Sequence, residues 1–393
     1  MCQYVPKFVD LNFKSRAKRP TGKNWHQARI GFNVYCGTQC SRRSGKKTTW
    51  HVVLLKPKFT HRRSMKLIIP MAGRGTRLRP HTHVTPKPLM PVVGVTMVER
   101  LVNTFVEVLP RPLTEAVFVL GDFPTEVNDA LSGICDRNNM KASFVYQDKA
   151  LGTGHAVHCA AEHLEGEVVV VFADTLFVMD RPASLDEADV VAWVKHVDDP
   201  SRFGVAVRDG GRITGFVEKP TELISNEALI GIYYVRDGAQ LRSAIRRLID
   251  EHITGHGGEY QLTDAFDILL KQDLVFKTEG VTDWLDCGTI EAFMETSRFI
   301  LTREAETRGE VIDSELIQPV FVAEGATISN STVGPNVVLE EGSSIRESTV
   351  RESILFSGAR VDDSDLVDSM VGRHATIYSA TGRLNVGDHS SFG

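Results

Sequence analysis

The chain has 393 residues and a formal net charge of -5 at pH 7, and its 42% hydrophobic and 24% charged residues are the balance of a globular protein. The length suffices for a large core domain and a smaller partner. No apolar run approaches the ~18 residues of a membrane helix, and the N-terminus lacks the apolar stretch of a secretory signal. The six cysteines follow no pairing pattern, as in a reducing compartment. We therefore expect a cytoplasmic protein without a membrane or nucleic-acid partner.

Residues 1–64 differ in charge from the rest of the chain. They hold 15 Lys and Arg against the single acidic Asp10, whereas the remainder holds 30 Lys and Arg and 49 Asp and Glu. Three interpretations compete: a disordered tail, an arm for nucleic acid or another acidic surface, or translated upstream sequence that the native protein lacks. Because Met65 directly precedes the first convincing strand, we favour the third interpretation, with the tail next. We assign residues 1–64 no chemistry.

Residues 65–305 alternate short apolar runs with amphipathic stretches. Strands are predicted at 66–70, 116–121, 142–146, 168–173 and 190–194, several of them apolar throughout, as buried central strands are. Helices are predicted at 156–164 and where apolar residues recur at helical spacing, namely at Val98, Leu101, Val102, Phe105 and Leu109. This alternation predicts an α/β domain, a Rossmann-like and mostly parallel mixed sheet with helices on both faces.

Residues 312–393 have a different texture. An aliphatic residue recurs every five to seven positions, with Gly, Asn and Ser between, and the series continues through Ile345, Val350, Ile354, Val361, Leu366, Val371 and Ile377. Regular inward aliphatics with small turn residues at the corners predict a stacked parallel β-helix. The pattern resembles the left-handed β-helix of hexapeptide-repeat proteins. It indicates a fold strongly and a function weakly.

A glycine-rich turn follows the first predicted strand. Gly73, Gly75, Thr76 and Arg77 come directly after it, and Lys87 lies between two prolines soon afterwards. Glycines let backbone N–H groups approach a phosphate, and the two cations add donors that have no apparent carboxylate partners nearby. The sequence therefore predicts a phosphate cradle. Its spacing differs from the dinucleotide fingerprint and from the Walker loop, so neither a dehydrogenase nor a P-loop ATPase is supported.

The string from Pro70 to Arg77, followed by Pro86-Lys87-Pro88-Leu89, resembles the signature of the sugar-1-phosphate nucleotidyltransferases, and of glucose-1-phosphate thymidylyltransferases in particular. Later segments fit the same family in the same order, so the resemblance covers residues 66 to about 300. It implies an enzyme that joins a nucleoside triphosphate to a sugar 1-phosphate and releases pyrophosphate. It also identifies residues 65–305 as the nucleotidyltransferase domain.

The resemblance carries site residues over one by one. Gln147 and Gly152 match the nucleobase contacts, although Gly154 stands where alanine is common, and we expect His155 to be a helix residue facing solvent or neighbours. Gly204, Glu218 and Gly231 match sugar contacts, and Lys219 matches the residue that holds the phosphate of the sugar 1-phosphate. We prefer this to a surface pair of Glu218 with Lys219, because adjacent strand residues point to opposite faces unless a bulge or turn intervenes. The segment 259–264 has an expected supporting role.

Asp174 and Asp286 are the expected metal ligands. Asp174 ends an apolar strand, where open α/β sheets place ligands, and Asp286 matches the second metal carboxylate of the family. Two carboxylates without a His or Cys set favour Mg²⁺. The attacking phosphate is already mostly dianionic, since its second pKa is about 6, so no general base is needed. Arg77, Lys87 and Lys219 are the expected catalytic cations, and the work is positioning and electrostatic stabilisation.

The base and the sugar stay open at this point. We expect dTTP and glucose 1-phosphate, while UTP with an N-acetylhexosamine phosphate or glucose 1-phosphate, and GTP with mannose 1-phosphate, are alternatives. Two other classes compete: acyl transfer by the β-helix, whose only histidines are His374 and His389, and a regulatory subunit without activity. The first lacks a recognisable carrier site, and the second would have lost charged site residues. We expect a homo-oligomer.

Overall fold

The computed structural model describes residues 64–73 and 75–393. The basic segment therefore lies outside the described residues except for Ser64, and its three interpretations stay predictions. The boundaries proposed for the two domains also stay predictions. Within the described residues, no helix is long and apolar enough to cross a membrane.

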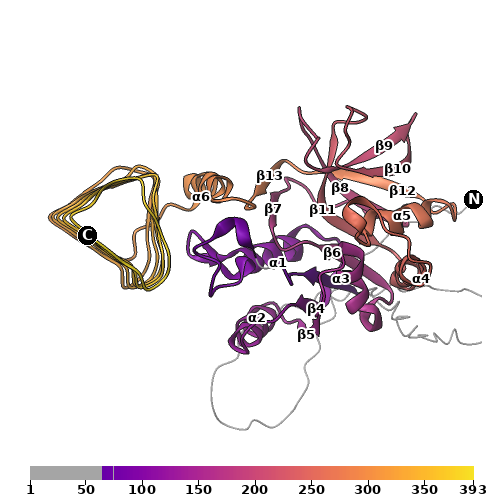
Figure 1. The fold of residues 1–393 in the computed structure, drawn as a ribbon, viewed down its shortest axis with the longest axis horizontal. Coiled ribbons are helices and arrows are strands. Elements are labelled where there is room, and N and C mark those ends of the chain that lie inside the picture. The colour runs from indigo at the N-terminus through magenta and orange to yellow at the C-terminus, as the bar shows by residue number, and fades with distance from the viewer. Residues whose placement is uncertain (1–63, 74) are drawn as a thin grey trace, which may run out of the picture. The chain divides into compact units, whose positions relative to one another are not determined.

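A nine-stranded mixed sheet forms the centre of the first part (Figure 1). Its strands are β1 (Met65–Pro70), β4 (Leu113–Leu120), β5 (Lys141–Tyr146), β6 (Glu167–Val171), β8 (Val190–His196), β9 (Gly204–Asp209), β10 (Arg212–Glu218), β11 (Glu227–Val235) and β12 (Phe276–Gly280). The order is β10-β9-β11-β6-β1-β4-β5, and β8 pairs with β11 and β12. Strands β6, β1, β4 and β5 run parallel, whereas β11 is antiparallel to β6. The mixed, Rossmann-like sheet expected from the sequence is confirmed.

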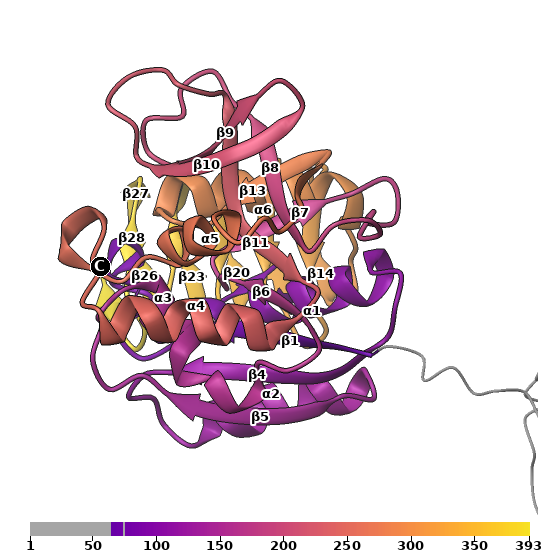
Figure 2. The same cartoon turned by 90° about the vertical axis from the view of Figure 1, so that its right-hand side faces the viewer.

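Helices cover both faces of this sheet. They are α1 (Met97–Val108), α2 (Glu126–Arg137), α3 (Thr153–Cys159), α4 (Gly238–Asp250) and α5 (Leu262–Leu270). The sixth helix of the described residues, α6 (Ile290–Glu304), packs mainly against short strands outside this sheet. Side chains alternate along β1, so Leu67 and Ile69 pack in one core with α1 and α2, while Ile68 packs in a second core with α3, α4 and α5. Figure 2 shows α4 in front of the sheet. The site therefore rests on strands that are buried on both sides.

Two helix boundaries differ from expectation. Leu109, expected on the apolar face of the first helix, is instead the extended C-cap of α1, because the following Pro110 disfavours helical geometry at the residue before it. The stretch predicted as one helix at 156–164 begins at Thr153 and is split into α3 and a short 3₁₀ turn, η3 (Ala161–His163). Helix α3 still buries Val157 in the core beside the sheet, whereas no residue of η3 is buried.

Two pairs of short strands lie outside the main sheet. Strand β7 (Thr175–Val178) follows β6 after a turn and pairs antiparallel with β13 (Asp283–Asp286). Strands β2 (Pro91–Val92) and β3 (Val95–Thr96) form a hairpin before α1. Two 3₁₀ turns, η1 (Thr76–Leu78) and η2 (Lys87–Leu89), lie between β1 and this hairpin, and η4 (His256–Gly258) precedes α5. The β7–β13 pair brings two distant parts of the chain to the same place.

The second part is a triangular coil, seen end-on in Figure 1. Each side of the triangle is a sheet of short parallel strands that stack from one coil to the next. The first sheet holds β14 (Glu310–Ile312), β17 (Thr327–Ser329), β20 (Ser344–Arg346), β23 (Arg360–Asp362), β26 (Thr376–Tyr378) and β29 (Ser391–Phe392). The second holds β15 (Glu315–Leu316), β18 (Thr332–Val333), β21 (Thr349–Arg351), β24 (Asp365–Val367) and β27 (Thr381–Gly382). The third holds β16 (Val320–Val322), β19 (Val337–Leu339), β22 (Ser353–Leu355), β25 (Met370–Val371) and β28 (Asn385–Val386).

Aliphatic columns hold this coil together. Ile328 lies opposite Ile345, which lies opposite Val361, which in turn lies opposite Ile377, and all four are buried. A column of this kind lets each coil bury apolar surface against the next, and a single coil cannot do this. The left-handed parallel β-helix expected from the repeat is confirmed.

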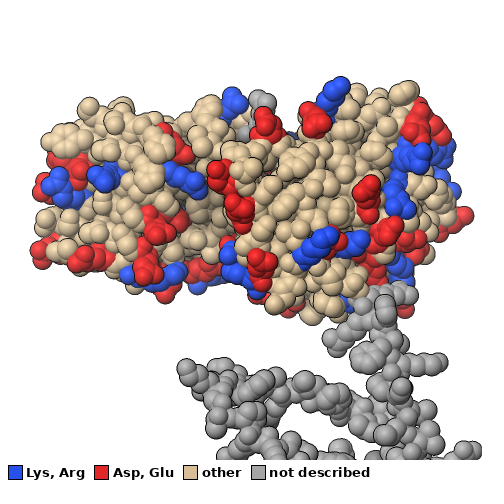
Figure 3. Space-filling model, turned by 90° about the horizontal axis from the view of Figure 1, so that it is seen from below, with Lys and Arg blue, Asp and Glu red and all other residues tan. Residues whose placement is uncertain are grey.

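Charged side chains of both signs are interspersed on the face shown in Figure 3. Exposed ion pairs also link neighbouring coils of the β-helix, such as Arg346 with Asp362 at 2.9 Å and Arg351 with Asp365 at 3.1 Å. Exposed pairs of this type contribute little to stability, because water and salt screen their charges.

Candidate active site

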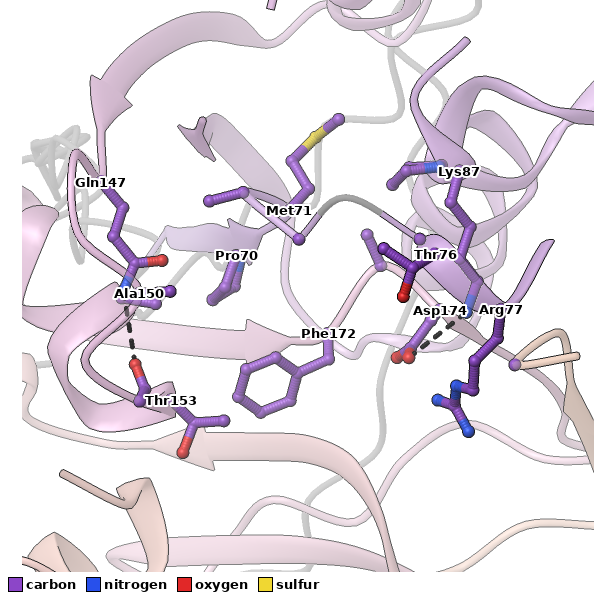
Figure 4. A pocket seen from close by; sticks show the side chains of 18 of the residues that line it. Pro70, Met71, Thr76, Arg77, Lys87, Gln147, Ala150, Thr153, Phe172 and Asp174 are labelled. Carbon is purple, nitrogen blue, oxygen red and sulfur yellow. Dashed lines mark hydrogen bonds and ion pairs between the residues drawn. The ribbon is translucent and has the colours of Figure 1, made fainter. Parts of the chain in front are cut away.

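One cavity of about 400 Å³ opens where the phosphate cradle, residues 151–156 (the base loop) and the end of β6 meet (Figure 4). The expected residues that line it are Gly73, Gly75, Thr76, Arg77, Lys87, Gln147, Gly152 and Asp174. Because β1 and β6 are parallel neighbours, the cavity lies at the carboxyl end of the parallel strands, where open α/β sheets bind ligands. The structure therefore brings together the residues expected for the nucleotide.

The glycine turn is folded onto Lys87. Gly75 has a positive φ of 59°, and a Cβ there would lie 2.9 Å from the Cβ of Lys87. The hydroxyl of Thr82 donates a hydrogen bond of 2.8 Å to the carbonyl oxygen of Gly75. Position 75 therefore requires glycine for two reasons, its left-handed backbone and the close approach of Lys87. Sequence reasoning missed Thr82.

Lys87 has a carboxylate partner, contrary to expectation. Its Nζ lies 3.4 Å from Oδ2 of Asp174, and the Lys87 side chain is 9% exposed while that of Asp174 is 48% exposed. The absence of a carboxylate near Lys87 in the sequence was misleading, because Asp174 reaches it through the parallel pairing of β1 with β6. A buried ammonium beside a half-exposed carboxylate places one cation and one anion at the mouth of the phosphate cradle.

Asp174 and Asp286 approach each other through the β7–β13 pair. Asp286 is the register partner of Thr175, the neighbour of Asp174, and paired Cα atoms in antiparallel strands lie about 4.5–5.5 Å apart. The charges of Lys87, Asp286 and Asp174 all act on the Cys287 thiol, whose pKa burial raises to about 12. A Cβ on Gly288 would lie 2.9 Å from Oδ1 of Asp286. Asp174 and Asp286 therefore lie near each other, Asp286 on β13 and Asp174 in the turn just before β7.

The base loop depends on a second segment of the chain. Gly152 has a φ of 114°, and a Cβ there would lie 2.5 Å from the carbonyl oxygen of Tyr260. Tyr260 in turn donates its N–H to Leu151 and accepts the N–H of Gly154. The adjacent Glu259 lines the cavity. The segment 259–264, expected only to support the site, therefore shapes the wall against which the base loop is held.

The Gln147 side chain is held by the base loop. Its Nε2 lies 3.4 Å from the carbonyl oxygen of Gly152 and 3.0 Å from Nδ1 of His155, the third residue of α3. His155 faces a neighbour, as expected, but that neighbour is a cavity residue. Burial, and to a smaller extent His158, hold the pKa of His155 below its usual value. Sequence reasoning gave this histidine no part in the site.

The residues expected for the sugar lie outside this cavity. Gly204 and Glu218 are register partners on β9 and β10, and a Cβ on Gly204 would lie 2.9 Å from Oε2 of Glu218. Gly231, with a φ of 79°, packs against Phe172, which does line the cavity. Neither Phe172 nor Gly288, which also lines the cavity, was singled out from the sequence.

Glu218 and Lys219 form the mutual pair that strand alternation argued against. The Lys219 Nζ lies 3.9 Å from Oε1 of Glu218. The reason is that β10 ends at Glu218 and Lys219 has a φ of 47°, so a turn replaces the alternation. The contact is long and the Lys219 side chain is 48% exposed, which leaves the ammonium accessible to a ligand.

Comparisons with known proteins agree with this geometry. Residues 66–303 match the family model described as nucleotidyl transferase. The chain is 28% identical over 359 residues to a glucose-1-phosphate thymidylyltransferase of Streptomyces griseus, covering 83% of this chain and 98% of that protein. It is 29% identical over 362 residues to the low-salt glycan biosynthesis nucleotidyltransferase Agl11 of Haloferax volcanii, covering 83% and 99%.

A third relative and two solved structures extend the comparison. The bifunctional protein GlmU of Methanococcus aeolicus is 28% identical over 349 residues, covering 82% of this chain and 81% of that protein. A Bacillus anthracis structure described as a glucose-1-phosphate thymidylyltransferase has a TM-score of 0.50 at 27% identity, covering 60% of this chain and 95% of its own. A UDP-glucose pyrophosphorylase has the same fold, with a TM-score of 0.51 at 24% identity, covering 61% and 100%. Since the family model spans more than half of the chain, this protein belongs to the nucleotidyl transferase family.

Proposed function

We propose that this nucleotidyltransferase joins dTTP and glucose 1-phosphate to give a nucleotide sugar and pyrophosphate. The observation that carries the proposal is the single cavity that combines the phosphate cradle, the Lys87–Asp174 pair and the base loop. The choice of dTTP and glucose 1-phosphate is supported by two relatives named for that activity, from Streptomyces griseus and Streptomyces antibioticus. The second is 25% identical over 363 residues.

The proposed reaction is an in-line displacement at the α-phosphate. An oxygen of the sugar phosphate forms the new bond to phosphorus, and the bond between the α- and β-phosphates breaks as pyrophosphate leaves. The attacking phosphate is already mostly dianionic near neutral pH, since its second pKa is about 6, so no side chain has to remove a proton. The enzyme must instead bring two anions together and hold them in line.

The basic residues divide this task. Arg77 and the glycine turn lie together in the cavity wall, where they can hold the departing pyrophosphate. Lys87 is placed to offset charge at the α-phosphate, because its ammonium is buried at the cavity beside Asp174. Lys219, which lies outside the cavity and is half exposed, takes the phosphate of the sugar in this proposal. In this proposal the three cations stabilise the charge of the phosphates and form no bond to phosphorus.

Nucleotidyltransferases of this family use a divalent metal ion, and the acidic residues fit Mg²⁺. Asp174 and Asp286 supply carboxylate oxygens, and no group of three or more His, Cys, Asp or Glu that could hold a metal occurs among the described residues. Two carboxylates are the set that Mg²⁺ uses when substrate phosphates and water complete its shell. Bound there, the ion would neutralise charge on the phosphate oxygens.

A substrate panel tests this proposal. The full chain is incubated with Mg²⁺, each of four nucleoside triphosphates and several sugar 1-phosphates, and products are identified by mass. We expect the highest kcat/KM with dTTP and glucose 1-phosphate, and no product after chelation of the metal. A higher kcat/KM with GTP and mannose 1-phosphate would overturn the choice of substrates, and absence of any nucleotide sugar would overturn the function.

Location and assembly complete the proposal. A nucleotide-sugar synthase works where nucleoside triphosphates and sugar phosphates are present, which is the cytoplasm. We also propose a homo-oligomer, which light scattering coupled to size-exclusion chromatography would measure directly. A single species at 43.5 kDa, the mass of one chain, would contradict it.

A further inference from the structure

The orientation of the Gln147 amide is fixed by its two partners. A backbone carbonyl oxygen can only accept a hydrogen bond, so the end of the amide that faces Gly152 must be the nitrogen. The second amide hydrogen then points to Nδ1 of His155, 3.0 Å away, which accepts if the ring carries its proton on Nε2. Both amide hydrogens are used within the protein.

The remaining atom of the amide faces the cavity. Gln147 lines the cavity, and Figure 4 shows its Oε1 turned toward the middle of the space. No hydrogen bond to Oε1 is made within the part of the chain that the structure describes. The backbone of Gln147 is itself anchored, since its N–H donates to Leu120 at 2.8 Å. The site therefore offers a fixed acceptor to whatever base it binds.

Neutral His155 is required for this arrangement. A protonated ring would carry a hydrogen on Nδ1 and would donate there, which would turn the amide over and present its nitrogen to the cavity. The lowered pKa of His155, caused mainly by burial, keeps the ring neutral near neutral pH. His155 does not line the cavity, so it acts on a bound base only through Gln147.

We propose that His155 is a positioning residue that locks the Gln147 amide, so that Oε1 accepts the imide N–H of thymine or uracil and disfavours cytosine. Thymine and uracil carry a donor at ring position 3, whereas cytosine carries an acceptor at the same position. A fixed acceptor forms a hydrogen bond with the N–H of thymine or uracil. Facing cytosine, the same acceptor places its lone pair against the lone pair of the ring nitrogen, which is repulsive. The inference rests on the proposed function for the place of the base, and it adds the residue that sets which bases fit.

Equilibrium binding of UTP, dTTP and CTP separates this inference from the proposed function. Dissociation constants are measured by calorimetry on the full chain with Mg²⁺, alongside kcat/KM with glucose 1-phosphate. We expect the wild-type protein to prefer UTP and dTTP to CTP. His155→Ala frees the amide to rotate and should narrow that preference by about tenfold, the worth of one hydrogen bond.

Two further variants distinguish positioning from packing. His155→Gln restores an acceptor and should recover part of the preference, whereas His155→Lys supplies only donors and should shift the preference toward CTP. His196→Ala, at an exposed histidine on β8 that does not line the cavity, is the control and should leave the ratio unchanged. A purely structural role for His155 would weaken all three nucleotides equally.

The outcomes are distinct. An unchanged ratio in both His155→Ala and His155→Lys, or a wild-type preference for CTP, would overturn the inference. If the wild-type protein binds UTP and dTTP selectively but turns over no sugar phosphate, the proposed function fails and the inference stands. Heat-denaturation midpoints of each variant identify any loss of binding that comes from unfolding.

Discussion

The Nε2 of His81 lies 2.6 Å from Oδ1 of Asn385, so the segment between the phosphate cradle and Lys87 is bonded to the last coils of the β-helix. His81 is 2% exposed, and its ring lies 5.4 Å from that of Phe356 in the β-helix. A Cβ on Gly387 would lie 2.9 Å from Cβ of Pro80, so the two backbones approach closely. The β-helix is therefore packed against the chain that carries two of the proposed catalytic cations.

Asn385→Ala should loosen this contact. It removes the partner of a buried imidazole, which costs about 1–3 kcal/mol, and we expect lower unfolding stability together with reduced kcat. Asn385→Asp keeps an acceptor oxygen and should retain more of both. Arg346→Ala, which removes an exposed pair elsewhere on the β-helix, serves as the control. Equal effects of Asn385→Ala and Arg346→Ala on urea unfolding would show that the contact with His81 contributes nothing.

Stability should fall as the pH falls below about 6.5, the usual histidine pKa. Burial lowers the pKa of His81 in the folded protein, although Asn385 and Asp388 act in the opposite direction. The unfolded chain therefore binds more protons than the folded one in this window, so the free energy of unfolding decreases with acidification. His81→Gln should flatten the dependence between pH 7 and 5.5 in urea titrations. His196→Gln, at an exposed histidine, should leave the slope as it is.

Asp174→Asn and Asp286→Asn should each lower pyrophosphate release by roughly 10²–10³-fold, the loss typical when one electrostatic group of an active site is removed. Both substitutions keep the shape of the side chain, and Asp286 keeps its place opposite Thr175 through backbone pairing. Chelation of divalent ions should abolish the wild-type activity. Near-normal turnover in both variants, with circular dichroism unchanged, would reject the proposed metal ligands.

Lys219→Met should raise the KM for the sugar 1-phosphate by about tenfold, since a charged hydrogen bond contributes about 1.5–3 kcal/mol. The KM for the nucleoside triphosphate should change little, because Lys219 lies outside the cavity that holds the base loop. Initial-rate kinetics with each substrate varied in turn measure both constants. A change confined to the KM for the nucleoside triphosphate would contradict the proposed role of Lys219 at the sugar 1-phosphate.

Gly152→Ala should destabilise the fold by about 1–3 kcal/mol, the cost of a strained backbone position, and should weaken nucleotide binding. The methyl group would lie 2.5 Å from the carbonyl oxygen of Tyr260 on a backbone with φ at 114°. Gly211→Ala is the matched control, because a Cβ there meets nothing within 4 Å. Thermal denaturation and calorimetry with dTTP compare the two. If they behave alike, Tyr260 does not constrain the base loop.

Much of the fold could be predicted because it depends on local patterns. Apolar runs such as 168–173 indicated buried strands, and the aliphatics from Ile345 to Ile377 indicated the β-helix, since each pattern matches one backbone period. Leu109 was placed wrongly within its helix although Pro110 was visible. The pairing of Glu218 with Lys219 was also misjudged, because the left-handed turn at Lys219 follows no periodicity.

The sequence by itself determined which residue types follow the predicted strands: the glycine turn after 66–70, Gln147 after 142–146 and Asp174 after 168–173, with Lys87 and Asp286 in motifs of their own. Only the tertiary structure decided their relations. Lys87 meets Asp174 because β1 and β6 are neighbours, and Asp286 reaches the same place through the pairing of β13 with β7. The hydrogen bond between Gln147 and His155 could not be predicted from the sequence either. A hydrogen bond depends on distance and direction in space, and neither follows from spacing along the chain.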